Sequence, residues 1–264
     1  MNALLQSRTE GHRLDVVFGN GRRKNALSRA LLAELTAVFA APDDQVKIAF
    51  MRGTGGVFSA GADLNDIHGT ADDAAYDDDV TTLTEAIRRF PAPVVAVIEG
   101  PCMGAAVHLA LACDLRIAVE GATFAVPATE LGLLYNPDAI ARLHGRLPAE
   151  TLTRLFVLGE RFSASDAPAA GLAGETVAPE GLDRRMTELV DQVSKNDAHA
   201  AALTKQLLDD LDRGTADLAA WQEIYRDLLD TPARAEAVAT VKKRLGLNES
   251  AAGSPEKFKE AQAR

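Results

Sequence analysis

Apolar and polar positions along the chain predict alternating strands and helices. The stretch RLDVVFG (Arg13–Gly19) contains β-branched residues and ends at a glycine, which is typical of a strand. From Ser28, apolar residues recur at helical spacing in SRALLAELTAVFAA, so a serine-capped helix is expected. QVKIAFMRG (Gln45–Gly53) and PVVAVIEG (Pro93–Gly100) read as further strands, and TTLTEAIRRF (Thr81–Phe90) as the helix between them. This order predicts an α/β core with interior strands.

From about Gly181 the pattern becomes wholly helical. We therefore expect a core over residues 1–195 and a C-terminal helical region over residues 196–247. The polar tail, residues 248–264, is expected to be disordered because it lacks the apolar residues that a packed segment needs.

Charge and composition exclude several classes of function. The 264 residues carry 28 Lys and Arg against 38 Asp and Glu, a net charge of −10. An acidic surface argues against nucleic-acid or anionic-membrane partners, so an anionic ligand would need its own basic patch. Cys102 and Cys113 have no metal-ligand spacing, and we expect no metal. No signal core or membrane-length apolar run is present, which predicts a soluble cytoplasmic protein.

Two turns rich in small residues each follow a predicted strand. Gly104-Ala105-Ala106 opens a helix after the strand at Pro93–Gly100, and FSAGADL (Phe58–Leu64) follows the strand at Gln45–Gly53. Free N–H groups at such turns attract negative charge, and two that converge form an oxyanion hole. Each turn taken alone is equally compatible with tight packing or a flexible connection.

Two side chains near these turns are candidates for chemistry. His108 lies three residues beyond Ala105, so both share one helix face. It would either sit near a bound anion or be a core histidine bonded to a neighbour. Tyr135 precedes Pro137, which can open a helix, and is either functional or simply packed. The basic stretch GRRKNALS (Gly21–Ser28) is either a phosphate-contacting loop or a solvated turn.

Taken together, five stretches resemble the crotonase (enoyl-CoA hydratase/isomerase) superfamily. They cover about residues 10–180 and are RRKNALS, FSAGADL, PVVAVIEGPCMGAAVHLALACDLRIA, ATFAVPATELGLLYNPDAI and LGERFSASDAPAAGLAGETV. The resemblance implies a spiral ββα core of the α/β class with a C-terminal helical trimerisation region. It also implies a homotrimer or a dimer of trimers. The expected ligand is an acyl-CoA thioester, with coenzyme A as part of the substrate and no permanently bound cofactor.

The resemblance also implies roles for individual residues. The backbone N–H groups of Ala62 and Ala105 would form the oxyanion hole, and further binding positions would be Ala60, Asp63, Leu64 and Gly104. Phosphates of coenzyme A would meet Arg22, Arg23 and Lys24, and a second basic cluster that a neighbouring subunit could supply is Lys242, Lys243 and Arg244. We expect the acidic run Asp72–Asp79 to form a mobile surface segment near the acyl pocket, without a metal.

The chain departs from the standard hydratase pattern at both catalytic glutamates. His108 holds the position of the first, and Ala128 holds that of the second. Glu130 lies two residues further on, where a turn could point it elsewhere. The segment around Tyr135 resembles methylmalonyl-CoA decarboxylases, whose active-site tyrosine it matches, but those enzymes have a histidine where this chain has Ala62.

Three hypotheses follow from these departures. The protein is a CoA-dependent lyase of the hydratase or dehydratase kind, active in fatty acid metabolism, with His108 in place of the glutamates. Alternatively, it is a decarboxylase of a branched malonyl-type CoA ester, or carries out other enolate chemistry, to which Tyr135 would contribute. The third reading is a catalytically weak acyl-CoA-binding protein.

Overall fold

The computed structural model describes residues 4–19 and 21–247, which fall into two compact units, Met1–Ala216 and Asp217–Arg264. The expected tail, residues 248–264, lies outside the described residues. The first unit extends beyond the boundary expected at residue 195, because helix α7 (Ala198–Arg213) is held to the core. Lys205 on this helix forms an ion pair of 2.8 Å with Asp114.

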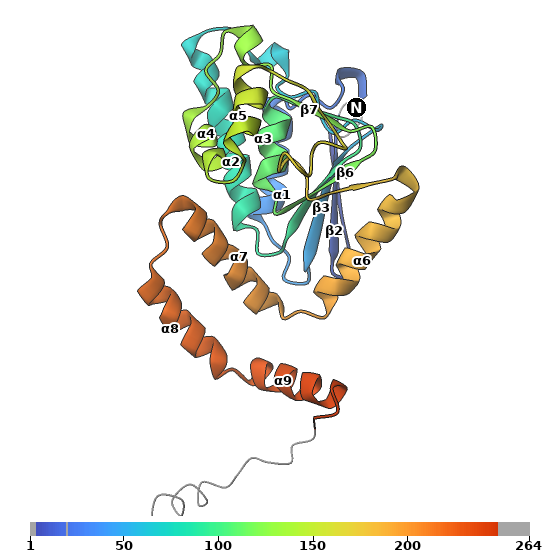
Figure 1. The fold of residues 1–264 in the computed structure, drawn as a ribbon, viewed down its shortest axis with the longest axis vertical. Helices are drawn as coiled ribbons and strands as arrows, with labels where there is room; N and C mark the ends of the chain where they lie inside the picture. Colours follow the sequence, from blue (N-terminus) through green and yellow to red (C-terminus); the bar gives the residue numbers. More distant parts are fainter. Residues whose placement is uncertain (1–3, 20, 248–264) are drawn as a thin grey trace, which may run out of the picture. The chain divides into compact units, whose positions relative to one another are not determined.

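A mixed sheet forms the centre of the first unit (Figure 1). Among the described residues it has six strands in the order β1-β2-β3-β4-β6-β9, and only β1 runs antiparallel to its neighbour. Its strands are β1 (Leu5–Glu10), β2 (Arg13–Phe18), β3 (Ile48–Gly53), β4 (Val94–Ile98), β6 (Leu115–Val119) and β9 (Glu175–Val177). A second, three-stranded sheet consists of β5 (Pro101–Met103), β7 (Thr123–Ala125) and β8 (Phe162–Ser163).

Helices cover both faces of the large sheet (Figure 1). Strand β4 shows why, because Val94 and Ala96 pack into one core cluster while Val95 and Val97 pack into another. The first cluster includes buried residues of the helices on one side, and the second includes those of the helix on the other. The first set is α1 (Arg29–Ala40), α2 (Ala74–Arg89), α3 (Ala105–Ala112) and α4 (Pro137–His144), and the second is α6 (Leu182–Ser194). The partly buried Leu152 of α5 (Ala149–Leu152) also packs against the first cluster.

The acidic run, which was expected to form a mobile surface segment, is helical. Asp72 and Asp73 belong to a 3-10 helix, Ala71–Asp73, and the rest of the run forms the first turns of α2. Asp73 accepts the backbone N–H groups of His68 and Gly69, in the loop before these helices, at 2.8 and 2.7 Å.

The second unit consists of two helices, α8 (Leu218–Leu229) and α9 (Pro232–Arg244). Asp217 caps α8 by accepting the N–H groups of Ala219 and Ala220, and Thr231 caps α9. The basic cluster Lys242, Lys243 and Arg244 forms the last turn of α9. No helix within the described residues is long and apolar enough to cross a membrane.

Candidate active site

The turn after β3 is fixed by two short parallel pairings. Ser59 pairs with Cys102 of β5, with its N–H donating to Pro101 and its carbonyl accepting from Met103, both at 3.0 Å. Ala62 pairs with Leu27, whose backbone bonds to the carbonyl of Gly61 and the N–H of Asp63. Neighbouring amides of an extended segment point in opposite directions, so the N–H of Ala62 faces away from Leu27.

Helix α3 begins beside this turn. Gly104 precedes it in a left-handed conformation (φ +55°), and Ala105 is its first residue, whose N–H has no acceptor within the helix. At Gly61, φ is +92°, and a Cβ there would lie 2.6 Å from the carbonyl oxygen of Met103 and 3.6 Å from the nitrogen of Ala105. The turn therefore approaches the helix start so closely that only glycine fits at position 61.

The remaining residues of the predicted turn differ in their exposure and in their hydrogen-bond partners. The N–H of Ala60 donates to the carbonyl of Lys24 at 2.9 Å, and Leu64 is largely exposed. Asp63 is buried, and its carboxylate accepts from Arg23 at 2.7 Å and from Asn65. Burial alone would raise the pKa of Asp63, but the bonds from Asn65 and Arg23 outweigh it and lower the pKa. Arg23 thus ties the basic loop to the turn.

The loop over Gly21–Ser28 is shaped by a residue that the sequence analysis did not single out. Lys24 and Asn25 both have positive φ (+50° and +57°), and Asn25 is fully buried. Its amide donates to the carbonyls of Thr54 and Val57 at 2.8 and 2.7 Å. Asparagine tolerates left-handed backbone better than most residues, and this tolerance was the available signal. The exposed side chains of Arg22 and Lys24 lie on this loop.

His108 lies one turn beyond Ala105 and is 5% exposed. Its Nε2 has no hydrogen-bond partner among residues 4–19 and 21–247. Burial, and then the charges of Arg88 and Arg142, lower the pKa of His108 to about 4. The imidazole is therefore neutral at pH 7, and protonating it would place a third positive charge near two buried or half-buried arginines.

Tyr135 faces His108, with 6.3 Å between the ring centroids and a 72° angle between the planes. Its other neighbour is Phe156, at 4.9 Å, which lies in a π-helical turn, Thr153–Val157. Burial, followed by the charge of Asp77, raises the pKa of Tyr135, so the phenol keeps its proton. The geometry thus brings together the two side chains that the sequence singled out.

The position of the second glutamate is apolar. Ala128 is buried, just before a 3-10 helix, Thr129–Leu131. Glu130 is exposed on that helix, and its Oε1 lies 3.8 Å from where a Cβ of Gly159 would be. Among the described residues no group of three or more acidic, histidine or cysteine side chains could hold a metal ion.

Comparisons with known proteins agree with this architecture. The family model described as enoyl-CoA hydratase/isomerase matches residues 14–244. The chain belongs to the enoyl-CoA hydratase/isomerase family. A solved structure of an enoyl-CoA hydratase/carnithine racemase from Magnetospirillum magneticum superposes with a TM-score of 0.85 at 25% identity, covering 92% of this chain and 94% of that one. The fold is therefore the crotonase fold that the sequence predicts.

Two curated relatives are similar to about three quarters of the chain. The rat enoyl-CoA hydratase domain-containing protein 3, mitochondrial, is 30% identical over 72% of this chain, and the chain spans 65% of its length. Methylmalonyl-CoA decarboxylase from Escherichia coli K12 is 28% identical over 73% of this chain and 76% of its own.

Two charged residues near the site have contacts that the sequence analysis did not predict. Asp77 on α2 is half-buried, and its pKa is raised by burial against a lowering hydrogen bond from Asn136, the neighbour of Tyr135. Arg88, near the end of the same helix, is buried and acts electrostatically on His108. Their positions depend on how α2 packs against α3 and α4, which no local pattern encodes.

Proposed function

We propose that this protein processes acyl-CoA thioesters through an enolate or related anion held by the backbone N–H groups of Ala62 and Ala105. The observation that carries the proposal is the close approach of the turn at Gly61 to the first amide of α3. Preorganised N–H donors stabilise charge that develops on a thioester oxygen, and removing one donor typically costs about 100-fold or more in rate.

His108 and Tyr135 would then face the acyl group next to the thioester. A histidine with a pKa of about 4 is a neutral hydrogen-bonding group at pH 7 rather than a strong base. Hydration of an enoyl thioester needs groups that activate water and deliver a proton, and the usual glutamate pair is absent at His108 and Ala128. Hydratase-like lyase activity would therefore depend on His108 in place of that pair.

The low basicity of His108 favours decarboxylation of a malonyl-type CoA ester as a second candidate. In that reaction the bond between the α-carbon and the carboxylate breaks, CO₂ leaves, and the electron pair passes into the thioester enolate. The enolate then takes a proton at the α-carbon. No strong base is needed, and the half-buried Tyr135 beside His108 could orient the acyl group or supply the proton from its phenol. The decarboxylase relative is consistent with this candidate.

The remaining roles belong to the same proposal. Arg22, Arg23 and Lys24 lie exposed on the loop that is joined to the turn and would contact coenzyme A phosphates. Ala60, Leu64 and Gly104 would line the thioester. The C-terminal helices would assemble a homotrimer or a dimer of trimers, and Lys242, Lys243 and Arg244 would approach the ligand of a neighbouring subunit.

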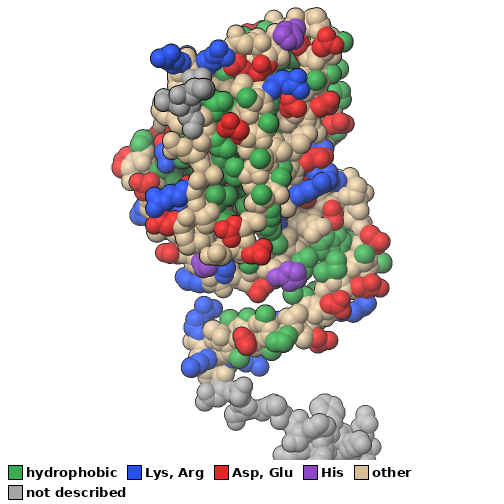
Figure 2. Space-filling view, turned by 180° about the vertical axis from the view of Figure 1, so that it is seen from behind, with side chains coloured by type: hydrophobic (Ala, Val, Ile, Leu, Met, Phe, Trp, Pro, Cys, Tyr) green, Lys and Arg blue, Asp and Glu red, His purple; other side chains and the backbone are tan. Residues whose placement is uncertain are grey.

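On the face in Figure 2, acidic and basic side chains are interspersed.

The deciding experiment measures turnover of crotonyl-CoA, by loss of the conjugated thioester absorbance, and of methylmalonyl-CoA, by released CO₂. His108→Ala and Tyr135→Phe are compared with wild type, and His144→Ala, which changes an exposed histidine on α4, is the control. We expect wild type to turn over at least one of the two thioesters. In His108→Ala that turnover should be lowered about 10- to 1000-fold. Sensitivity of decarboxylation to Tyr135→Phe would select the second candidate.

Binding without turnover would have a different meaning. If crotonyl-CoA and methylmalonyl-CoA bind but neither reacts, and a wider acyl-CoA panel is also inert, the protein is an acyl-CoA-binding protein of low catalytic power. If no acyl-CoA binds, the proposed function is wrong.

A further inference from the structure

Arg88 is a buried guanidinium with too few partners. Its side chain is 4% exposed, and its Nη1 reaches Asp209 only at 3.4 Å. Asp209 also accepts a hydrogen bond from the Nε of Arg213 at 2.7 Å, so its negative charge is shared between two arginines. Nε and Nη2 of Arg88 have no acceptor among the described residues. These two atoms form the parallel fork that binds a carboxylate with two hydrogen bonds, and a buried charge without such a partner is costly.

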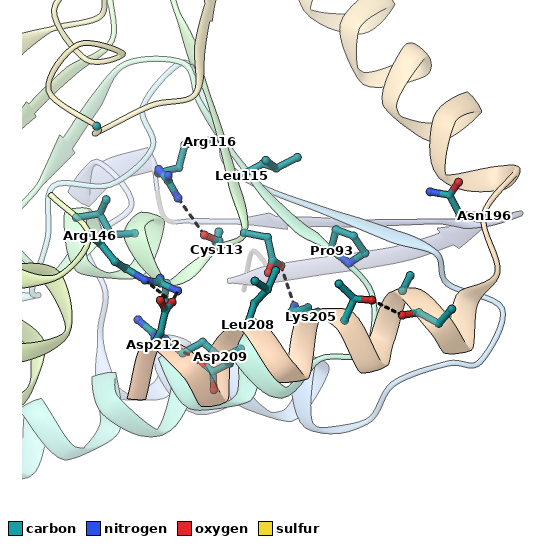
Figure 3. Close-up of a pocket in the computed structure, with 18 of the residues that line it drawn as sticks. Pro93, Cys113, Leu115, Arg116, Arg146, Asn196, Lys205, Leu208, Asp209 and Asp212 are labelled. Carbon is teal, nitrogen blue, oxygen red and sulfur yellow. Dashed lines mark hydrogen bonds and ion pairs between the residues drawn. The ribbon is translucent and has the colours of Figure 1, made fainter. Parts of the chain in front are cut away.

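A cavity of about 1010 Å³ lies between the end of α3 and helix α7, and Arg88 lines it. Figure 3 shows its charged wall. Two lining carboxylates are already paired, Asp212 with Arg146 and Asp114 with Lys205.

Arg116 is a second lining cation with little compensation. Its Nη1 donates to the carbonyl of Cys113 at 3.0 Å, and its Nε has no acceptor within the described ranges. Two residues that line the cavity, Arg88 and Arg116, thus carry buried guanidinium N–H groups without an acceptor, which a carboxylate would satisfy.

The cavity lies at the C-terminal end of α3, and the proposed oxyanion hole lies at the N-terminal end of the same helix. His108, Leu111 and Ala112 share one face of this helix by helical spacing, and Leu111 and Ala112 line the cavity. The positive charge of Arg88 acts on His108 and helps to lower the pKa of this histidine. From Ala105 to Leu111 the helix rises about 9 Å, the reach of an acyl chain of roughly six to eight carbons.

We propose that the preferred substrate is a CoA thioester whose acyl group ends in a carboxylate, and that Arg88 binds this carboxylate at the end of α3. The inference rests on the proposed acyl-CoA function and names its substrate class. The distal carboxylate would complete the fork of Arg88, while a methyl-terminated chain would leave that fork unpaired. The enzyme therefore distinguishes the two kinds of substrate at the far end of the acyl chain, away from the reacting thioester.

The test compares two saturated ligands of about eight carbons, octanoyl-CoA and its ω-carboxylated counterpart suberyl-CoA, by isothermal titration calorimetry. Wild type is expected to bind suberyl-CoA roughly 10- to 100-fold more tightly. Arg88→Met should abolish this preference while octanoyl-CoA still binds, which also reports correct folding. Arg88→Lys keeps the positive charge without the forked pair of N–H donors and should retain only part of the preference for suberyl-CoA. Arg89→Met is the matched control, because Arg89 is 73% exposed on the same helix.

Several outcomes would overturn the inference. Equal affinity of wild type for the two thioesters refutes it while leaving the acyl-CoA function intact, as does a preference that survives in Arg88→Met. Arg88-dependent binding of free suberate without any preference between the thioesters would make the cavity a site for a free anion instead. Failure of both thioesters to bind refutes the proposed function itself.

Discussion

At the scale of single residues, the environment of His108 makes stability depend on pH. Its pKa is about 4 in the folded protein and near 6.5 when unfolded. Between these values the unfolded chain binds the extra proton, so the free energy of unfolding falls as pH is lowered. The contribution of His108 to the free energy of unfolding is fully present above pH 6.5 and is lost as the pH falls toward 4.

We therefore expect wild type to lose roughly 2 kcal/mol more stability than His108→Gln between pH 7 and pH 5. Urea unfolding at both pH values measures this, and the carboxylates, which are common to both proteins, cancel in the comparison. His144→Gln, at an exposed position, should behave like wild type. Equal losses in wild type and His108→Gln would show that burial does not depress the pKa.

The sequence predicted where His108 lies but not what surrounds it. Helical spacing from Ala105 is a local property, so the shared face of α3 could be read directly. Arg88 and Arg142 come from α2 and α4, and only tertiary packing brings their charges to the imidazole. The structure leaves the catalytic roles of His108 and Tyr135 as predictions.

At the scale of elements, the approach of the Gly61 turn to α3 depends on one missing side chain. Gly61→Ala would force a contact near 2.6 Å with the Met103 carbonyl in a left-handed backbone. We expect a loss of about 2 kcal/mol or more in unfolding free energy, together with lost acyl-CoA turnover.

Gly69→Ala is the matched control for this prediction. Gly69 also has positive φ (+72°), but a Cβ there meets nothing within 4 Å. Gly69→Ala should lower the free energy of unfolding by about 1 kcal/mol and leave acyl-CoA turnover unchanged. Equal stability and turnover of the two variants would mean that the turn does not hold the anion site.

Strands and helices were predictable to different degrees. Dense apolar runs gave β3 and β4, and serine capping gave α1, whose Ser28 side chain accepts the N–H of Leu31. The start of α2 at Ala74 was missed because the acidic run lacks an apolar stripe. Asp73, at the N-cap of α2, instead fixes the preceding loop by accepting the N–H groups of His68 and Gly69. Strand β1 was also missed; it is an exposed edge strand without a buried side.

At the scale of the whole molecule, the C-terminal helices present apolar side chains to solvent. Leu218 and Tyr225 on α8 are 60% and 56% exposed, and Leu245 just after α9 is 63% exposed. Such surfaces usually mark association, and closed symmetric oligomers are the common outcome.

Light scattering coupled to size exclusion should therefore give a mass of about three times the 28.0 kDa chain, or twice that value for a dimer of trimers. Tyr225→Glu should lower the mass, whereas Glu223→Gln, on the same helix, should not. A monomer at micromolar concentration would contradict the assembly.

The pairings of Ser59 with Cys102 and of Ala62 with Leu27 also bear on the order of events during folding. Each joins segments that are far apart along the chain, and such contacts form slowly because a long loop must close first. No short fragment containing only the turn or only the helix start could hold the two amides together. Competence to bind the ligand should thus appear late in refolding, in the same kinetic phase as the parallel sheet.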